Sequence, residues 1–268
     1  MDNTVESRLA LLHTSLQEIL DRVVEIRERH NLQYSLAYGT LIGAIRHNGF
    51  IPWDDDLDIV MPRKDYLRFI EYCKTELPNQ YYYQGVENEK KYWLVFGKVR
   101  KKDTLFIEEH IDQDRFPMSK QGIFIDIFPI DGVKNNKKVL LLYNKIIRKI
   151  AVIMHGKITK RSHIAKDWIS DFIPKSICLL VYNIIVKIAT SNKPDYYVDL
   201  ELDLSKSFQF YSVDNNSKRM HLEKHVFEGK EYWIPVNYHE ALMSVYGEYW
   251  VLPPKSERKA HLPIELEF

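Results

Sequence analysis

The sequence predicts an α+β fold in which a mixed sheet is flanked by helices. Helical periodicity and short β-rich runs alternate through the first half of the chain, two strongly apolar helical segments follow, and mixed character returns past residue 195. The 268 residues, 45% of them hydrophobic, suffice for one large domain or two small ones, and no Gly/Ser-rich linker or internal repeat divides them. We therefore expect one domain over residues 1–268, with a core at about 17–135, a helical insertion at about 136–192 and a C-terminal α+β region at about 195–268.

The elements of the core follow from periodicity and from turn residues. Apolar residues recur at three- and four-residue steps over residues 9–29, which predicts an amphipathic helix that packs against the sheet. A strand is expected at 34–38, a short helix at 40–47 after Gly39, and a further helix at 64–77 that Pro78 ends. Strands are expected at 81–86 and 92–101.

The second half begins with apolar helices expected at 139–153 and 177–189, followed by a strand at 232–236 and a helix at 238–246. Neither apolar run reaches the roughly 18–20 uncharged residues that span a bilayer. This region contains many basic residues, which could bind an anionic membrane surface. Core-facing helices with solvated lysines are the simpler interpretation. These basic residues are Lys145, Arg148, Lys149, Lys157, Lys160, Arg161, Lys175 and Lys187.

Two carboxylates give the strongest indication of chemistry. Asp56 and Asp58 alternate with Leu57 and Ile59, so in an extended strand both carboxylates share one face. Like charges held so close repel each other unless something positive lies between them. Because the candidate ligands are oxygen donors with no cysteine nearby, Mg²⁺ or Mn²⁺ is expected, and Mg²⁺ usually binds together with substrate phosphates.

Two further features extend this site. Gly39 and Thr40 precede a predicted helix, whose N-terminal N–H groups can bind a phosphate. Asp126 lies in a β-rich apolar run, where a charge is costly unless it is paired or coordinates a metal, so we take it as a third carboxylate. Alternatively, Asp126 caps a turn or pairs with Arg100 or Lys98. Asp131, between Pro129 and Gly132, has the surroundings of a turn residue and is expected to be structural.

The order of these features resembles a known family. The run from Tyr38 to Asp58, with Gly39-Thr40 at its start and Trp53-Asp54-Asp55-Asp56-Leu57-Asp58 at its end, is similar to the signature of the LicD family of phosphocholine transferases, to which the fukutin-type sugar-phosphate transferases are related. Three other segments support the resemblance, which covers residues from about 17 to 261: these are 61–66, 122–131, and 246–250 with 252–254. It implies a nucleotidyltransferase-like fold.

The resemblance also implies a reaction. A CDP-linked donor, usually CDP-choline, would transfer its phosphocholine to a hydroxyl of a cell-surface glycan, and CMP would leave. The acceptor could be a lipid-linked glycan. Asp56, Asp58 and Asp126 would hold the metal, and Asp126 could also accept the proton of the attacking hydroxyl. Gly39 and Thr40 would contact phosphate, Arg46 could bind a phosphate bidentately, and Lys98 is a second phosphate candidate.

The neighbouring residues are assigned with alternatives. Asp54 is in phase with Asp56 and could support the metal site, whereas Asp55 is out of phase on a regular strand and is expected to face away or to pair with Arg46 or Arg63. His47 could bind a phosphate or act as an acid or base, but a place in the loop is favoured. A choline headgroup calls for aromatic faces, which the sequence alone does not locate.

Composition limits the function classes. Lys plus Arg number 38 against 37 for Asp plus Glu, which argues against a nucleic-acid partner. Cys73 and Cys178 form no disulfide framework or metal motif, and the polar N-terminus does not resemble a signal peptide, so we expect a cytoplasmic protein, in possible contact with the inner face of the membrane. Two alternatives remain: transfer of a whole nucleotide to a small molecule or protein, and non-enzymatic nucleotide binding.

Overall fold

The computed structural model describes residues 3–109, 111, 121–156, 172–260 and 262–268. Within them the helices are α1 (Asn3–Arg29), α2 (Tyr38–His47), α3 (Arg63–Glu76), α4 (Lys137–His155), α6 (Lys175–Ala189) and α7 (Tyr238–Tyr246), with a 3₁₀ turn at Lys255–Glu257. The strands are β1 (Ser35–Leu36), β2 (Asp58–Pro62), β3 (Tyr81–Gln84), β4 (Gly97–Lys101), β5 (Leu105–Ile107), β6 (Phe124–Val133), β7 (Tyr196–Val198), β8 (Tyr211–Ser212), β9 (Leu222–Phe227), β10 (Lys230–Pro235) and β11 (Glu265–Glu267).

A mixed sheet organises the described part of the chain. Its strands run in the order β1-β2-β6-β4-β3, and the far end of β6 also pairs with β7, which pairs with β8. β2 and β6 are parallel, whereas the other neighbours are antiparallel. The expected α+β class with a mixed sheet is confirmed, and the parallel pair at its centre sets the positions of the site residues below.

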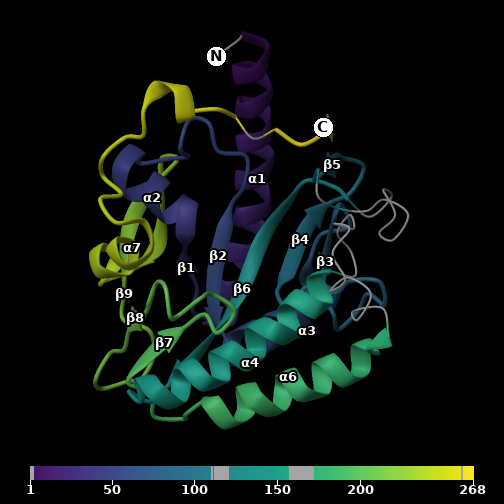
Figure 1. The fold of residues 1–268 in the computed structure, drawn as a ribbon. Coiled ribbons are helices and arrows are strands. Elements are labelled where there is room, and N and C mark those ends of the chain that lie inside the picture. The colour runs from purple at the N-terminus through teal and green to yellow at the C-terminus, as the bar shows by residue number, and fades with distance from the viewer. Residues whose placement is uncertain (1–2, 110, 112–120, 157–171, 261) are drawn as a thin grey trace.

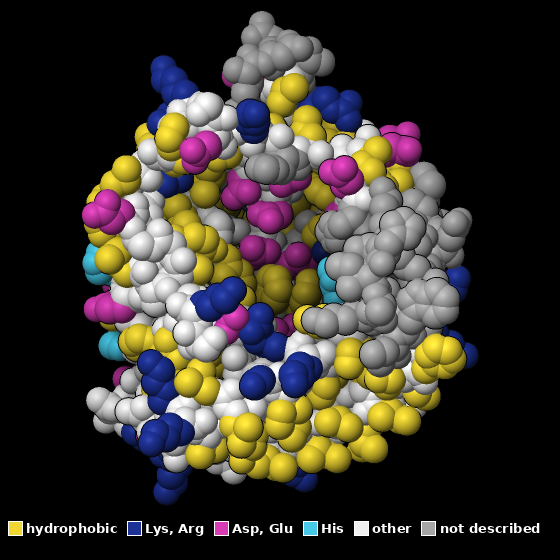
Figure 2. Space-filling view, in the orientation of Figure 1, with side chains coloured by type: hydrophobic (Ala, Val, Ile, Leu, Met, Phe, Trp, Pro, Cys, Tyr) yellow, Lys and Arg dark blue, Asp and Glu magenta, His cyan; other side chains and the backbone are white. Residues whose placement is uncertain are grey.

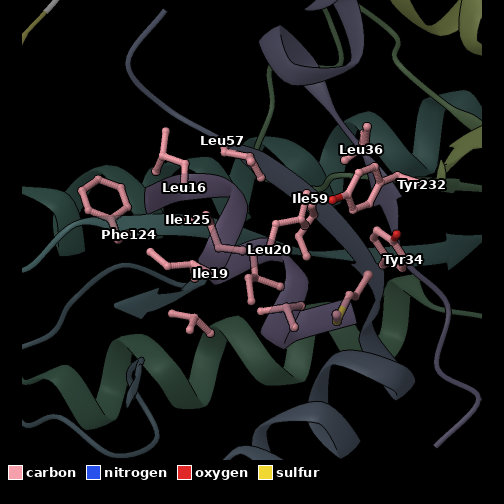
Figure 3. Close-up of a cluster of buried hydrophobic side chains, with 14 of the residues drawn as sticks. Leu16, Ile19, Leu20, Tyr34, Leu36, Leu57, Ile59, Phe124, Ile125 and Tyr232 are labelled. Atoms are coloured by element: carbon pink, nitrogen blue, oxygen red, sulfur yellow. The ribbon is translucent and has the colours of Figure 1, made fainter. Parts of the chain in front are cut away.

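Helices α1 and α3 cover one face of this sheet (Figure 1). The apolar stripe of α1, including Leu16, Ile19 and Leu20, packs onto Leu57 and Ile59 of the β2 segment (Figure 3), and all five side chains are fully buried. Burial of each such side chain contributes about 1.5–3 kcal/mol, so this contact fixes which face of β2 points into the core. The residues that alternate with the buried ones must therefore face the other way.

Helices α4 and α6 lie side by side and form a second apolar cluster (Figure 1). Ile147 and Met154 of α4 and Tyr182 and Val186 of α6 are buried there, against Val198 of β7. No described helix is long and apolar enough to cross a membrane. Lys157, Lys160 and Arg161, counted among the basic residues of this region, lie outside the described residues.

Most expected elements are present, with ends shifted by a few residues, but one strand is much shorter than expected. The strand predicted over 92–101 begins at Gly97, and its partner predicted over 81–86 ends at Gln84. Gln84 pairs with Lys98, and the chain then turns away where the Gly85 N–H donates to the Asn88 side chain. The residues before Gly97 therefore have no strand to pair with on this side.

The junction between β1 and α2 also differs from the expectation. β1 ends at Leu36 and α2 already begins at Tyr38, so Gly39 lies in the first helical turn instead of preceding it. Tyr38 makes the turn itself, with a left-handed φ of 49°. This conformation is costly for a bulky residue and persists only where surrounding contacts hold it. One such contact is the Tyr38 hydroxyl, which donates to the Asp199 carboxylate at 2.6 Å.

A buried ion pair joins α3 to β6. Arg63 donates from Nε and Nη2 to the two carboxylate oxygens of Asp131, both at 2.7 Å, and from Nη2 also to the Tyr182 hydroxyl of α6 at 3.1 Å. Asp131 lies within β6, so its predicted position in a turn is wrong. Because a cation at a helix N-terminus is unfavourable for the helix dipole, the position of Arg63 depends on this carboxylate.

Replacing Arg63 with Met should cost about 3–5 kcal/mol of unfolding free energy, because the Asp131 carboxylate, whose side chain is 0% exposed, then loses its partner. The double variant R63M/D131L should recover most of this loss, measured by urea unfolding. As a control, R68A removes a half-exposed arginine that lies 3.6 Å from Asp65, whose carboxylate still accepts the Gln33 N–H, and it should cost about 1 kcal/mol or less. Equal costs for R63M and R68A would contradict the role of this pair.

Candidate active site

Acidic side chains gather in a hollow at the centre of one face of the molecule, with apolar side chains beside them (Figure 2). Asp58 is the first residue of β2 and pairs in parallel register with Asp126 of β6. Paired residues on neighbouring strands point to the same side of a sheet. The backbone joins them further, since the Asp126 N–H donates to the Leu57 carbonyl at 2.9 Å. Two of the three predicted carboxylates thus come together through the register of one strand pair.

The loop before β2 supplies the other acids. Asp56 was expected on a regular strand, but β2 begins only at Asp58. Carboxylate oxygens of Asp54, Asp55 and Asp56 lie within 4.8 Å of one another. The expectation that Asp55 faces away is therefore wrong, because strand alternation does not apply to an irregular loop. His13 of α1 contacts the Asp54 carbonyl at 2.8 Å and helps to hold this loop.

Burial makes this set of acids electrostatically costly. Burial, together with the charge of Asp55, raises the pKa of Asp54 to about 6, and burial, together with the charge of Asp54, raises that of Asp56 to about 7. Burial and nearby carboxylates also raise the pKa of Asp58, and burial raises that of Asp126. A group of converging oxygen donors whose negative charges lack compensation fits a hard divalent cation.

Lys98 partly compensates these charges. Its Nζ lies 2.9 Å from Oδ1 of Asp126 and 3.7 Å from Glu108, and the side chain is 3% exposed. The alternative that Asp126 pairs with Lys98 is thus realised, whereas Arg100 instead donates to Gln84 and to the Gly122 carbonyl. Lys98 therefore neutralises a carboxylate, which leaves it less suited to the phosphate role considered for it.

The start of α2 is built around the same acids. The Thr40 hydroxyl accepts the backbone N–H of Asp58 at 2.8 Å and is buried. A Cβ at Gly39 would lie 3.0 Å from Oδ2 of Asp54, so only glycine leaves this carboxylate in place without a shift. Both residues therefore position aspartates. The N-cap residue of α2, Ala37, makes no side-chain hydrogen bond to the helix, which is compatible with the anion-binding role expected at this N-terminus.

Arg46 and His47 tie the end of α2 to the C-terminal region. Arg46 donates from Nε to Nε2 of His47 at 2.9 Å and from Nη1 to the Tyr249 carbonyl at 2.8 Å. Burial lowers the pKa of His47, and the Arg46 charge lowers it further, so His47 is neutral at pH 7. In this arrangement Arg46 anchors the C-terminal segment beside Asp54, whose charge also acts on Arg46.

Sequence reasoning missed three residues near the site. Tyr246 of α7 lies close enough to the acids for Asp58 and Asp56 to raise its pKa, after the larger effect of burial. Asp199 holds Tyr38, and Glu201 accepts the Tyr182 hydroxyl at 3.1 Å. These two acids alternate with Val198 and Leu200, the same pattern that singled out Asp56 and Asp58, so the signal was present in the sequence.

Comparison with known proteins identifies related sequences. A family model described as "LicD/FKTN/FKRP, nucleotidyltransferase domain" matches residues 31–145. The chain is 30% identical over 252 residues to the lipopolysaccharide cholinephosphotransferase LicD of Haemophilus influenzae, an alignment that covers 91% of each chain. Shorter segments are similar to uncharacterized proteins of Rickettsia typhi, 42% identical over 55 residues (20% of this chain and 18% of the relative), and of Rickettsia prowazekii, 43% identical over 51 residues (19% of each chain).

The match to the Haemophilus protein extends over nearly the whole chain. The chain therefore belongs to the LicD family.

Proposed function

We propose that this protein is a transferase that moves phosphocholine from a CDP-linked donor to a hydroxyl of a cell-surface glycan, with release of CMP. The observation that carries the proposal is the pairing of Asp58 with Asp126 in one hollow, beside the acid loop and the uncapped N-terminus of α2. The name of the Haemophilus relative supports phosphocholine as the group transferred. The CDP-linked donor is what the resemblance to the LicD family implies, and the N-terminus of α2 is compatible with its phosphates.

The same residues suggest how the reaction would proceed. Asp56, Asp58 and Asp126 would hold a divalent cation, Mg²⁺ or Mn²⁺, which stabilises negative charge on the departing CMP when bound. The donor diphosphate would lie against the α2 N-terminus, where backbone N–H groups favour an anion. Oδ1 of Asp126 contacts Lys98, so we assign Oδ2 as the atom that accepts the proton of the attacking glycan hydroxyl.

The glycan acceptor suggests a second contact. Along α6, five apolar residues are 37–60% exposed at the three- and four-residue spacing of one helix face, namely Ile177, Leu180, Val181, Ile184 and Ile188. Neither α4 nor α6 contains Asp or Glu, and both carry exposed lysines, namely Lys187 on α6 and Lys137, Lys138, Lys145 and Lys149 on α4. An apolar stripe with basic neighbours fits an anionic lipid surface, so we propose that this face binds the membrane peripherally and brings the site to a lipid-linked acceptor.

With purified protein, a glycan acceptor and Mg²⁺, CMP release from CDP-choline should fall by at least about a hundredfold in D58N and in D126N, because each change removes a carboxylate that the reaction needs. D103N, which changes an exposed acid outside the hollow, should retain activity. Release of pyrophosphate from a nucleoside triphosphate, with none of CMP from any CDP-linked donor, would instead establish nucleotide transfer. Binding of nucleotides without any turnover would establish the non-enzymatic alternative.

Metal binding should appear in the stability of the protein. Because the pKa values of Asp54 and Asp56 are raised to about 6 and about 7, the folded state binds more protons than the unfolded state, and the EDTA-treated protein should lose stability from about pH 4 to pH 7. At pH 7.5, Mg²⁺ or Mn²⁺ at a hundred times its Kd should restore about 2.7 kcal/mol, with little effect at pH 4.5.

The stability at each pH, with and without metal, is measured as the midpoint temperature of thermal unfolding. D56N should weaken both the pH dependence and the response to metal, whereas D103N should behave as wild type. If metal leaves the wild-type midpoint unchanged at pH 7.5, the acids do not form a cation site.

Membrane binding can be tested by sedimentation with vesicles. Wild-type protein should sediment with phosphatidylglycerol-containing vesicles more than with pure phosphatidylcholine, and L180S/I184S should bind about tenfold more weakly because apolar area is lost. L11S/V226S removes equally exposed apolar side chains elsewhere and is the matched control. Equal weakening by both pairs, or self-association of the wild type through this face in light scattering, would contradict the proposal.

A further inference from the structure

Three aromatic rings in succession lead away from the acidic site. Tyr38, at the start of α2, meets Phe128 edge-on with ring centroids 5.2 Å apart, and Phe128 meets Phe96 at 4.4 Å in a tilted stack. Phe128 and Phe96 are only partly buried, so part of each ring is open to solvent. The sequence indicated that aromatic faces are numerous in this chain, and the contacts now single out these three.

Strand geometry places these rings beside the carboxylates. Phe128 follows Asp126 by two residues in β6, so both side chains point to the same face of the sheet, about 7 Å apart along the strand. Lys98 pairs with Asp126 across the sheet, and Phe96 precedes Lys98 by two residues. A group attached to a phosphate at Asp126 through a short linker would therefore reach the Phe128 and Phe96 rings.

A cavity with a carboxylate continues from Phe96. It has a volume of about 370 Å³, and its lining includes Trp93, Phe96, Ala151, Val152 and Glu201. Arg148 and His155 also line it, and the Arg148 guanidinium lies 2.7 Å from the Asp203 carboxylate. A cavity with aromatic and aliphatic walls and a carboxylate is suited to an organic cation, which gains from aromatic faces and from a negative charge together.

The carboxylate of Glu201 lies where its negative charge is unfavourable. Burial and the neighbouring Asp199 raise its pKa to about 8, although Arg63 and the Tyr182 hydroxyl act to lower it. Its contacts with the Tyr182 hydroxyl and, through its own N–H, with Asp199 fix its position. A positively charged ligand in the cavity would favour the ionised form.

We propose that Phe96, Phe128 and Glu201 form the subsite for the trimethylammonium group of the donor and thereby select choline over uncharged headgroups. This inference rests on the proposed function, since it assumes that a phosphate lies at Asp126. The two-carbon linker of phosphocholine spans the step from the carboxylates to the rings. The rings are hydrophobic enough to receive the methyl groups, and Glu201 supplies the opposite charge.

The test compares two donors. CMP release is measured with CDP-choline and with CDP-glycerol for the wild type and for F96L, F96Y and E201Q. F96L should raise the KM for CDP-choline about five- to thirtyfold while that for CDP-glycerol changes little, F96Y should restore the wild-type value, and E201Q should act as F96L does. F172L, which changes a highly exposed phenylalanine, is the matched control and should change the KM for neither donor.

A second measurement does not require turnover. Isothermal titration should show that phosphocholine and tetramethylammonium bind the wild type more tightly than F96L, while CMP binds both equally. Equal effects of F96L on both donors, or on CMP binding, would overturn the subsite and leave the proposed function standing. Absence of turnover together with Phe96-dependent binding of phosphocholine would support the subsite and reject the proposed transfer.

Discussion

Mutual repulsion among buried carboxylates is the constraint on which this structure depends. Asp58 and Asp126 pair where β2 and β6 lie side by side, Asp56 lies in the loop before β2, and burial raises the pKa of each. A chain gains nothing in stability from such a group unless cations balance it, and Lys98 supplies one positive charge. The surrounding elements hold the acids against this repulsion: α1 supports the acid loop through His13, and Thr40 of α2 binds the backbone of Asp58.

A second set of buried polar contacts joins the helical region to the site. Arg63 links β6 and α6 through Asp131 and Tyr182, Tyr182 donates to Glu201, and the Asp199 carboxylate next to it holds Tyr38 at the start of α2. Removing one hydrogen-bond partner from such a network leaves other polar groups buried and unsatisfied. The resulting loss of stability exceeds the contribution of the single hydrogen bond. The region of α4 and α6 is therefore connected to the left-handed turn at Tyr38 by hydrogen bonds as well as by apolar packing. It also provides one wall of the cavity assigned to the headgroup.

The sequence predicted the fold class and most helices, because hydrophobic periodicity is a local signal, and it singled out Asp58 and Asp126, which the strand register pairs. It failed where tertiary pairing decides the outcome. The strand expected from residue 92 begins at Gly97 because its neighbour ends at Gln84, and Asp55 joins the acid group because the loop is irregular. Local pattern could not show that Lys98 is buried on Asp126 or that Phe96 meets Phe128, since both contacts join residues far apart in the sequence.

The central claim is that the carboxylates of β2, β6 and the preceding loop bind a divalent cation against the diphosphate of the donor. Phosphorus NMR of CDP-choline with wild-type protein and substoichiometric Mn²⁺ tests it most directly, because a paramagnetic ion broadens the resonances of nearby phosphorus nuclei. We expect both diphosphate resonances to broaden strongly with the wild-type protein. With D58N they should broaden no more than they do with Mn²⁺ in the absence of protein. Equal broadening with the two proteins, beyond that seen without protein, would show that the metal and donor meet elsewhere and would contradict the account.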